Sequence, residues 1–195
     1  MILVIDNYDS FSYNLVQMLG EIIKEKNESE RKIRVIRNDE MSVDEIKALK
    51  PSHIILSPGP GKPKDAGICE EVIKQLAKEY KILGVCLGHQ AICEVYGATI
   101  TYAKKLMHGK QSVIDVDTSC SIFDGLSKKE VVGRYHSLAA NPQTIPQELS
   151  VIATDDQGEI MAVKHKEYEL YGLQFHPESV LTPNGARMLE NFLFH

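Results

Sequence analysis

Residues Gly84-Val-Cys86-Leu-Gly88 form the segment of the sequence best suited to covalent chemistry. An apolar run precedes Cys86 and a helical pattern follows it, so the cysteine is expected on a sharp strand-to-helix turn. The close neighbours of a nucleophile on such a turn must be small, and Gly84 and Gly88 meet that need. The start of a helix also favours a thiolate over a thiol. The pattern favours a nucleophilic cysteine; a buried structural cysteine between incidental glycines is the alternative.

A nucleophilic thiol needs a base, and His176-Pro-Glu178 offers one. The tripeptide follows the last expected strand, so its loop should open at the same carboxyl edge of the sheet as Cys86. Positions i and i+2 of an extended chain project to the same side, which lets Glu178 turn toward His176 and fix its tautomer. Three residues alone would equally suit a surface loop. Together with the cysteine turn they predict a catalytic triad of Cys86, His176 and Glu178.

The loop Ser57-Pro-Gly59-Pro-Gly61 follows another expected strand. Loops of glycine and proline are often simple turns. This one, however, lies at the carboxyl end of a strand next to the cysteine unit, where its glycines would let backbone N–H groups approach a substrate. Together with the amide of Leu87 it would form an oxyanion hole for a tetrahedral intermediate. A phosphate-binding P-loop is excluded, because the chain has no G-x-x-x-x-G-K-[ST] pattern.

The remaining histidines support weaker predictions. His89 fits a structural role as well as a catalytic one, and the segment His136-Ser137-Leu138 ends an expected strand and could line the pocket. His53, His165 and His195 fit packing or surface positions. The seven histidines and four cysteines show no zinc-ligand spacing, so no metal site is expected. No cofactor is expected either.

Strands and helices alternate in the first half of the chain. Strand-length apolar runs and helix-period segments follow one another at residues 2–5, 11–23, 33–36, 43–49, 54–56, 68–76, 81–85 and about 88–96. Asp9 or Ser10 is expected to cap the first helix. This rhythm predicts an α/β fold with an open, mostly parallel, flavodoxin-like sheet flanked by helices. Binding sites in such sheets lie outside the carboxyl ends of the strands.

The second half of the chain has a different pattern. Its runs are short and separated by turn residues, at 112–116, 131–135, 149–153 and 160–163, which predicts a small antiparallel excursion. A last strand at 170–175 leads into His176, and residues 184–194 should close the chain as a helix. Because no repeat or linker interrupts the pattern, residues 1–195 are expected to form a single domain.

Composition narrows the class of protein and its location. The 195 residues are 43% hydrophobic with a formal net charge of -5, near the average for globular proteins, and they include no tryptophan. A negative chain with few aromatic residues is not expected to bind nucleic acid. The sequence contains no apolar run of about 18 residues and no signal peptide, so no membrane span is expected. The four cysteines form no C-x-x-C pair, which predicts free thiols in a reducing cytoplasm.

Taken together, the segments 84–90, 57–61 and 176–178 resemble the triad, or class I, glutamine amidotransferases. The resemblance covers essentially the whole chain and extends to segments 6–11, 107–110 and 134–138. These further motifs are similar to one branch of the family, the amidotransferase subunits of anthranilate synthase and aminodeoxychorismate synthase. Gly61-Lys-Pro63 looks more like the tryptophan-pathway form than the folate-pathway form.

The resemblance implies a role for each matching residue. Cys86 would be the nucleophile, His176 the general base and acid, and Glu178 the residue that orients His176. The oxyanion and the glutamine substrate would be held at Gly59, Pro60, Gly61, Leu87, Gln90, Ser137 and Leu138.

The resemblance also implies a partner, a larger chorismate-binding synthase subunit that receives the ammonia. Segment 6–11 would form part of the docking surface, with a solvated helix start as the competing interpretation. A subunit of the folate pathway, or one shared by both pathways, is the alternative among amidotransferases. Two further hypotheses are a non-catalytic flavodoxin-like binding module, in which Cys86 is core, and a thiol hydrolase with the same triad.

Overall fold

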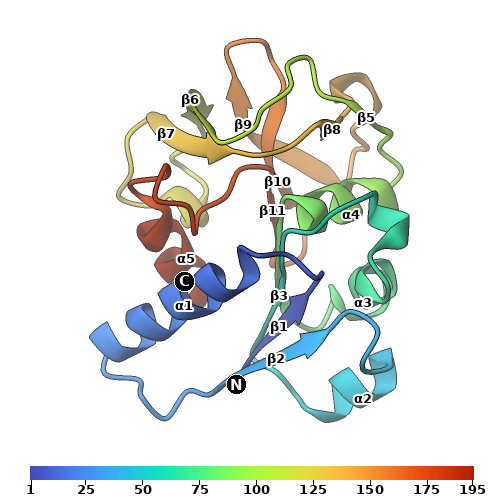
Figure 1. Cartoon of the computed structure of the whole chain (residues 1–195), viewed down its shortest axis with the longest axis vertical. Helices are drawn as coiled ribbons and strands as arrows, with labels where there is room; N and C mark the ends of the chain where they lie inside the picture. Colours follow the sequence, from blue (N-terminus) through green and yellow to red (C-terminus); the bar gives the residue numbers. More distant parts are fainter.

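The computed structural model describes residues 1–195, which form eleven strands and five α-helices (Figure 1). The strands are β1 (Ile2–Asp6), β2 (Ile33–Arg37), β3 (His53–Leu56), β4 (Lys81–Val85), β5 (Ile100–Tyr102), β6 (Lys110–Val116), β7 (Lys129–Arg134), β8 (Leu138–Ala140), β9 (Leu149–Asp155), β10 (Ile160–His165) and β11 (Leu170–Leu173). The helices are α1 (Ser12–Glu25), α2 (Val43–Ala48), α3 (Cys69–Leu76), α4 (Leu87–Val95) and α5 (Gly185–Phe194). Short 3-10 turns lie at η1 (Pro63–Asp65), η2 (Ser121–Phe123) and η3 (Pro142–Thr144).

Nine of the strands form one sheet in the order β2-β1-β3-β4-β11-β10-β9-β6-β7. The five strands from β2 to β11 are parallel, and the other four are antiparallel to their neighbours. This confirms the predicted α/β class. The antiparallel strands of the second half continue the main sheet. In the middle of the sheet Gly84 of β4 pairs with Leu56 of β3 and with Gly172 of β11. The chain segments that leave β3, β4 and β11 therefore emerge side by side.

Helices cover both faces of the parallel part of the sheet (Figure 1). One core lies under α1 and α5, where Leu15, Leu19 and Leu189 pack against alternate strand residues such as Val4. The other core lies under α2, α3 and α4. Because both faces are buried, every residue of β1 is buried, and such strands appear in the sequence as continuous apolar runs.

Two expectations about local structure were wrong or incomplete. Neither Asp9 nor Ser10 is the N-cap of α1: Phe11 holds that position without a side-chain cap. Asp9 Oδ1 accepts a hydrogen bond from the Phe11 N–H, 2.7 Å away, because a turn that begins at Asp9 precedes the helix. Strands β5 and β8, which pair with each other, went unpredicted because three residues are too few to show a period.

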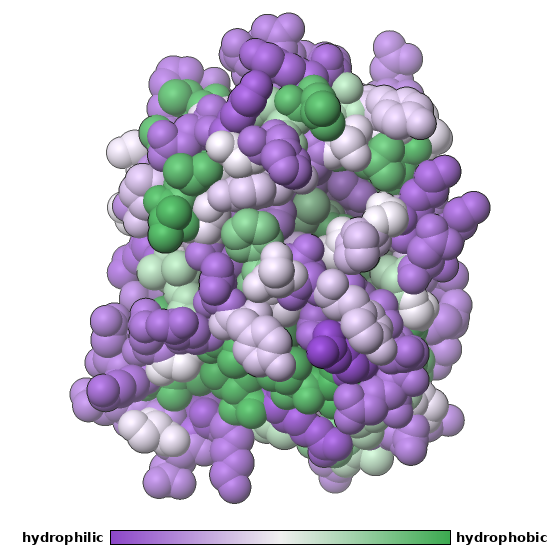
Figure 2. All heavy atoms as spheres, in the orientation of Figure 1, coloured by the Kyte–Doolittle hydropathy of each residue, from purple (hydrophilic) through white to green (hydrophobic).

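The surface is mixed in character. Hydrophilic residues cover most of the face in Figure 2, with smaller hydrophobic groups between them. Tyr13, Tyr102 and Val180 are large apolar side chains that stand exposed. None of the helices has the length and apolar character needed to cross a bilayer. All four cysteines are unpaired and buried.

Candidate active site

Cys86 occupies a sharp turn between β4 and α4, as the sequence predicts. Its backbone has φ 51° and ψ −97°, a conformation that residues other than glycine rarely adopt. Such strain persists only where the surroundings enforce it, and it is concentrated at functional sites. The turn sets the thiol at the start of α4, with 8% of the residue exposed.

The two flanking glycines are required by close backbone packing. A Cβ atom on Gly84 would lie 2.4 Å from the carbonyl carbon and oxygen of Gly88. A Cβ atom on Gly88 would lie 2.7 Å from the carbonyl oxygen of Leu56 in β3. Both distances are shorter than any real contact, so the turn tolerates no side chain at either position. The spacing G-x-C-x-G is therefore a steric requirement of the turn.

Replacing Gly84 with alanine is expected to destabilise the protein by about 1–3 kcal/mol, because the added methyl group meets backbone that cannot move aside. Gly20→Ala in α1 is the matched control, since a Cβ atom there meets nothing within 4 Å. That change should stabilise the helix by up to about 1 kcal/mol. Thermal unfolding measures both changes: relative to the parent, G84A should have a lower Tm and G20A a higher Tm. Equal Tm values for G84A and the parent would contradict the close packing.

His176 and Glu178 form a buried pair beyond the end of β11. His176 Nδ1 lies 2.7 Å from Glu178 Oε1, and both side chains are almost wholly buried. The other ring nitrogen, Nε2, has no hydrogen-bond partner in the protein and is free for proton transfer. Burial favours the neutral ring, but the neighbouring Cys86 and Glu178 outweigh it and raise the pKa of His176 to about 10. At neutral pH the ring therefore holds a proton beside Cys86.

Aromatic rings fix the orientation of the His176 imidazole. Phe11 packs against it at a centroid distance of 5.3 Å and Tyr135 at 4.8 Å. The Tyr135 hydroxyl lies 2.9 Å from Ser179 Oγ, and the Thr182 hydroxyl donates to the His176 carbonyl at 2.6 Å. Sequence reasoning did not find these supports, since they come from three separate parts of the chain: before α1, after β7 and between β11 and α5.

The Gly59 loop lies directly over the start of α4. A Cβ atom on Gly59 would lie 2.5 Å from Asn7 Cβ and 2.6 Å from Leu87 Cδ2. Asn7 holds the loop by two hydrogen bonds to Ser57: its N–H donates to Oγ at 2.9 Å and its Nδ2 donates to the carbonyl at 2.8 Å. The Gly59 N–H has no backbone acceptor, and Leu87, the first residue of α4, presents an N–H with no partner inside the helix. Both donors that the sequence suggested for an oxyanion are thus available.

A cavity of about 170 Å³ opens beside Cys86. Its lining is contributed by the Gly59 loop, the start of α4 and the segment between β7 and β8: Gly59, Pro60, Gly61, Cys86, Gln90, Tyr135, His136, Ser137 and Leu138. Six of the seven predicted substrate contacts are in this lining. Leu87 is not, because its side chain packs beneath the loop. The volume is below the 300–1,000 Å³ typical of drug-sized ligands and suits a small polar molecule.

Two buried glutamines connect the cavity wall to the sulfur. Gln174 Nε2 lies 3.6 Å from Cys86 Sγ, and Gln174 Oε1 accepts from Gln90 Nε2 at 3.1 Å. Gln90 Nε2 also donates to the Leu138 carbonyl at 3.0 Å. Gln174 was missed at the level of sequence. Its position near the end of the last expected strand and two residues before His176 was the available signal.

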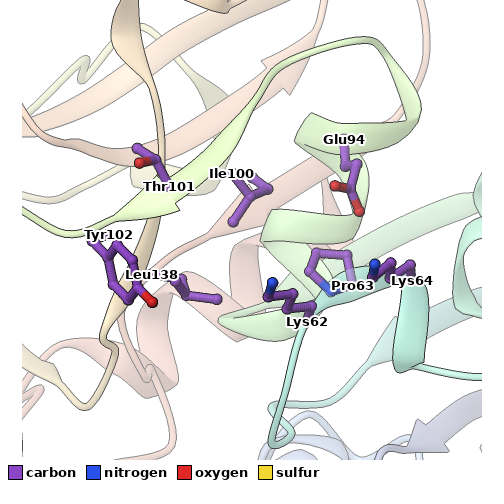
Figure 3. Close-up of a pocket in the computed structure, with 8 residues that line it drawn as sticks. All are labelled: Lys62, Pro63, Lys64, Glu94, Ile100, Thr101, Tyr102 and Leu138. Carbon is purple, nitrogen blue, oxygen red and sulfur yellow. The ribbon is translucent and has the colours of Figure 1, made fainter.

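A larger cavity of about 280 Å³ adjoins the first, and Leu138 lines both. Figure 3 shows Lys62, Pro63 and Lys64 facing Ile100 and Tyr102 across this space. Lys62 follows Gly61 directly, so the same loop borders both cavities. Leu138 therefore forms part of the wall between the cysteine cavity and the outer one.

His89 is a structural residue. It is fully buried, and burial lowers its pKa to about 4, so the ring is neutral. Its Nε2 atom lies 3.8 Å from the sulfur of Cys93, one turn further along α4. His53 and His165 are also buried, whereas His195 is largely exposed. No group of histidine, cysteine, aspartate or glutamate residues is arranged to hold a metal ion.

Comparison with known proteins assigns this chain to a family. The family model for "Glutamine amidotransferase class-I" matches residues 3–195. The chain is 49% identical over 193 residues to "Aminodeoxychorismate/anthranilate synthase component 2" of Bacillus subtilis (strain 168), covering 99% of this chain and 95% of that protein. It is 47% identical over 194 residues to "Anthranilate synthase component 2" of Cyanophora paradoxa, covering 99% and 98% of the two chains.

A solved structure shares the fold. The crystal structure of a glutamine amidotransferase from Thermotoga maritima superposes with a TM-score of 0.76 at 17% identity, over 98% of this chain and 95% of that one. At this identity the likeness concerns the fold alone. The family match over nearly the whole chain, together with relatives near half identity, decides the classification. The chain belongs to the class-I glutamine amidotransferase family.

Proposed function

We propose that this chain is the glutamine amidotransferase subunit of anthranilate synthase. It hydrolyses glutamine through a thioester on Cys86 and passes the ammonia to a chorismate-binding synthase subunit. The observation that carries the proposal is the buried His176–Glu178 pair beside a strained Cys86 at a cavity of about 170 Å³. Acyl transfer from a small amide requires a nucleophile and a base that is held in orientation, and a class-I glutamine amidotransferase with this arrangement has both.

The first half of the reaction forms the thioester. Cys86 attacks the side-chain amide carbon of glutamine as a thiolate, and the N–H groups of Gly59 and Leu87 stabilise the negative oxygen of the tetrahedral intermediate. The C–N bond then breaks. His176, whose raised pKa keeps it protonated at neutral pH, gives its proton to the departing nitrogen. Ammonia leaves and a glutamyl thioester remains on Cys86.

The second half of the reaction regenerates the enzyme. The neutral His176 takes a proton from a water molecule as that water attacks the thioester carbonyl carbon. The same two backbone N–H groups stabilise the second tetrahedral intermediate. The C–S bond then breaks, which releases glutamate and restores the thiolate and the protonated imidazole. Glu178 holds His176 in one orientation through both halves.

The binding cavity supports glutamine as the substrate. Gln90, Ser137 and Leu138 line the cavity and would hold the backbone end of glutamine, and Pro60 and Gly61 line it as well. We assign glutamine contacts to these five residues. Residues 1–195 would act as a single amidotransferase domain, without a cofactor. The four free thiols fit a reducing cytoplasm.

Exposed hydrophobic residues near the site support docking of a synthase subunit. Tyr8 lies in the loop before α1, Tyr13 lies in the first turn of α1, Tyr102 lines the outer cavity, and Val180 is two residues beyond Glu178. Single exposed apolar side chains are normal on a protein surface, so the support for docking is that these lie close in sequence or space to the site. We place the partner over them, where it would receive ammonia.

Segment 6–11 contains both buried and exposed residues, and only the exposed ones suit a docking surface. Asp6 and Asn7 are buried and bonded within the chain: Asp6 Oδ2 pairs with Arg37 Nη1 at 2.6 Å. Tyr8 and Ser10 are exposed. We therefore assign docking to the exposed residues alone, and the buried ones hold the loop in shape.

The choice of pathway rests on the segment Gly61-Lys-Pro63, which favours anthranilate synthase. The second candidate is a subunit that serves both anthranilate and aminodeoxychorismate synthases. The Bacillus subtilis relative favours it, because the name of that protein includes both activities.

A product assay separates these candidates. The chain is mixed with chorismate, glutamine and either an anthranilate synthase or an aminodeoxychorismate synthase component I, and each product is quantified. Glutamine-dependent anthranilate is the expected product. Formation of aminodeoxychorismate as well would establish the shared subunit, and product with the folate-pathway synthase alone would overturn the anthranilate assignment. Ammonium salts in place of glutamine control for the activity of each synthase.

A further inference from the structure

Arg134, the last residue of β7, is a buried cation behind the wall of the glutamine cavity. It is 3% exposed. Its Nη1 donates to Asp155 Oδ2 at 2.7 Å, and its Nη2 pairs with Glu159 Oε1. Two carboxylates thus compensate its charge. The third donor, Nε–H, points elsewhere and donates to His136 Nε2 at 3.1 Å.

The bond from Arg134 decides which ring nitrogen of His136 carries the proton. A guanidinium group can only donate, so His136 Nε2 must accept. The proton of the neutral ring is then on Nδ1, which lies 2.9 Å from the Leu138 carbonyl and donates to it. Burial, and next the charge of Arg134, lower the pKa of His136 to about 3, so the ring is neutral at physiological pH.

The Leu138 carbonyl is where this pair meets the active site. It also accepts the hydrogen bond from Gln90 Nε2, and Gln90 continues through Gln174 to the sulfur of Cys86. A continuous series of buried and partly buried contacts therefore links Arg134 to the cysteine. Because Leu138 borders both the cysteine cavity and the outer cavity, its position sets the shape of the wall between them.

We infer that Arg134 and His136 are positioning residues for glutamine binding: Arg134 fixes the tautomer with which His136 holds the Leu138 carbonyl in place. The inference rests on the proposed glutaminase activity. A buried ion cluster would by itself only stabilise the fold. Here it also affects the affinity of the cavity for glutamine. Arg134 does not line the cavity and acts through His136.

Two variants of His136 separate its two hydrogen bonds. His136→Asn places an amide nitrogen near the position of Nδ1, so a donor to Leu138 is retained. His136→Gln instead places its amide near the position of Nε2, so an acceptor for Arg134 is retained while the donor to Leu138 is lost. The expected result is a KM for glutamine raised about tenfold in H136Q, with kcat within about twofold of the parent. In H136N the KM should stay within about threefold of the parent value.

A double-mutant cycle tests the role of Arg134. Arg134→Lys keeps a positive charge for Asp155 and Glu159 but removes the Nε–H donor, so His136 is free to place its proton on Nε2. We expect R134K alone to raise the KM for glutamine about fivefold, and to have no further effect when added to H136N, where no tautomer needs fixing. The assays use the complex with its synthase, and ammonia-dependent synthesis should be unchanged in every variant.

The outcomes are distinct. Equal KM values for the parent, H136Q and R134K, even with lowered Tm values, would show that the cluster is only structural and would overturn the inference. Independent, additive effects of R134K and H136N would also overturn it. Absence of glutamine hydrolysis in the unmodified complex would instead refute the proposed function, so the two failures cannot be confused.

Discussion

Replacing Cys86 with alanine is expected to lower glutamine-dependent synthesis by the complex by at least about 10³-fold. Without the sulfur no thioester forms, and the remaining oxyanion donors have nothing to stabilise. Synthesis from added ammonium salts should persist, because the synthase subunit then needs no ammonia from this chain. Anthranilate formation with glutamine and with ammonium sulfate, measured side by side, checks both halves of the prediction.

Cys93→Ala is the matched control for Cys86→Ala. Cys93 lies on the same helix, is fully buried, and has a thiol whose pKa burial raises to about 12, so it is unreactive at neutral pH. Its loss should leave glutamine-dependent turnover within about threefold of the parent value, apart from a small loss of stability. Full activity of Cys86→Ala would favour the non-catalytic module, in which Cys86 is simply part of the core.

Replacing Glu178 with glutamine is expected to lower kcat for glutamine hydrolysis by about 10²–10⁴-fold. The amide keeps the shape of the side chain but removes the charge that helps hold the proton on His176. The pKa of His176 should fall, and an amide can accept or donate at Nδ1, so the ring is no longer held in one tautomer. Steady-state kinetics should show the loss chiefly in kcat, because the glutamine cavity is untouched.

The same substitution should change how stability depends on pH. The pKa of His176 is about 10 in the folded protein and near its ordinary value of 6.5 in the unfolded chain. The proton on His176 therefore contributes stability that is fully present below pH 6.5 and lost as pH rises toward 10. The free energies of unfolding of the parent and E178Q, measured in urea, should differ most near pH 6 and least near pH 10. A difference that stays constant with pH would contradict the raised pKa.

Much of the fold was predictable because its sheet is buried on both faces. β1, β3 and β4 are almost wholly buried, which gives apolar runs of strand length that the sequence displays openly. The turn at Cys86 was predictable for a steric reason, since only glycine fits at positions 84 and 88. Glu178 faces His176 as the sequence suggested, but the segment is not extended: residues 176–179 form a turn in which the Ser179 N–H donates to the His176 carbonyl.

The residues that sequence reasoning missed depend on contacts between distant parts of the chain. Gln174 reaches Cys86 across 88 positions, and Arg134 meets Asp155 and Glu159 at separations of 21 and 25. No local pattern encodes such contacts, because they exist only once the sheet has aligned its strands. β5 and β8 were missed for a related reason: each is three residues long and is defined by its pairing with the other.

Trapping the thioester tests whether Cys86 carries the glutamyl group during turnover. The complex is mixed with glutamine and chorismate and quenched in acid within a single turnover, and the digested chain is analysed by mass spectrometry. The expected result is that the peptide containing Cys86 gains the mass of one glutamyl group, and that the same peptide of the Cys86→Ala variant gains none. A glutamyl mass on a different residue, or release of ammonia from glutamine by Cys86→Ala at the parent rate, would contradict it.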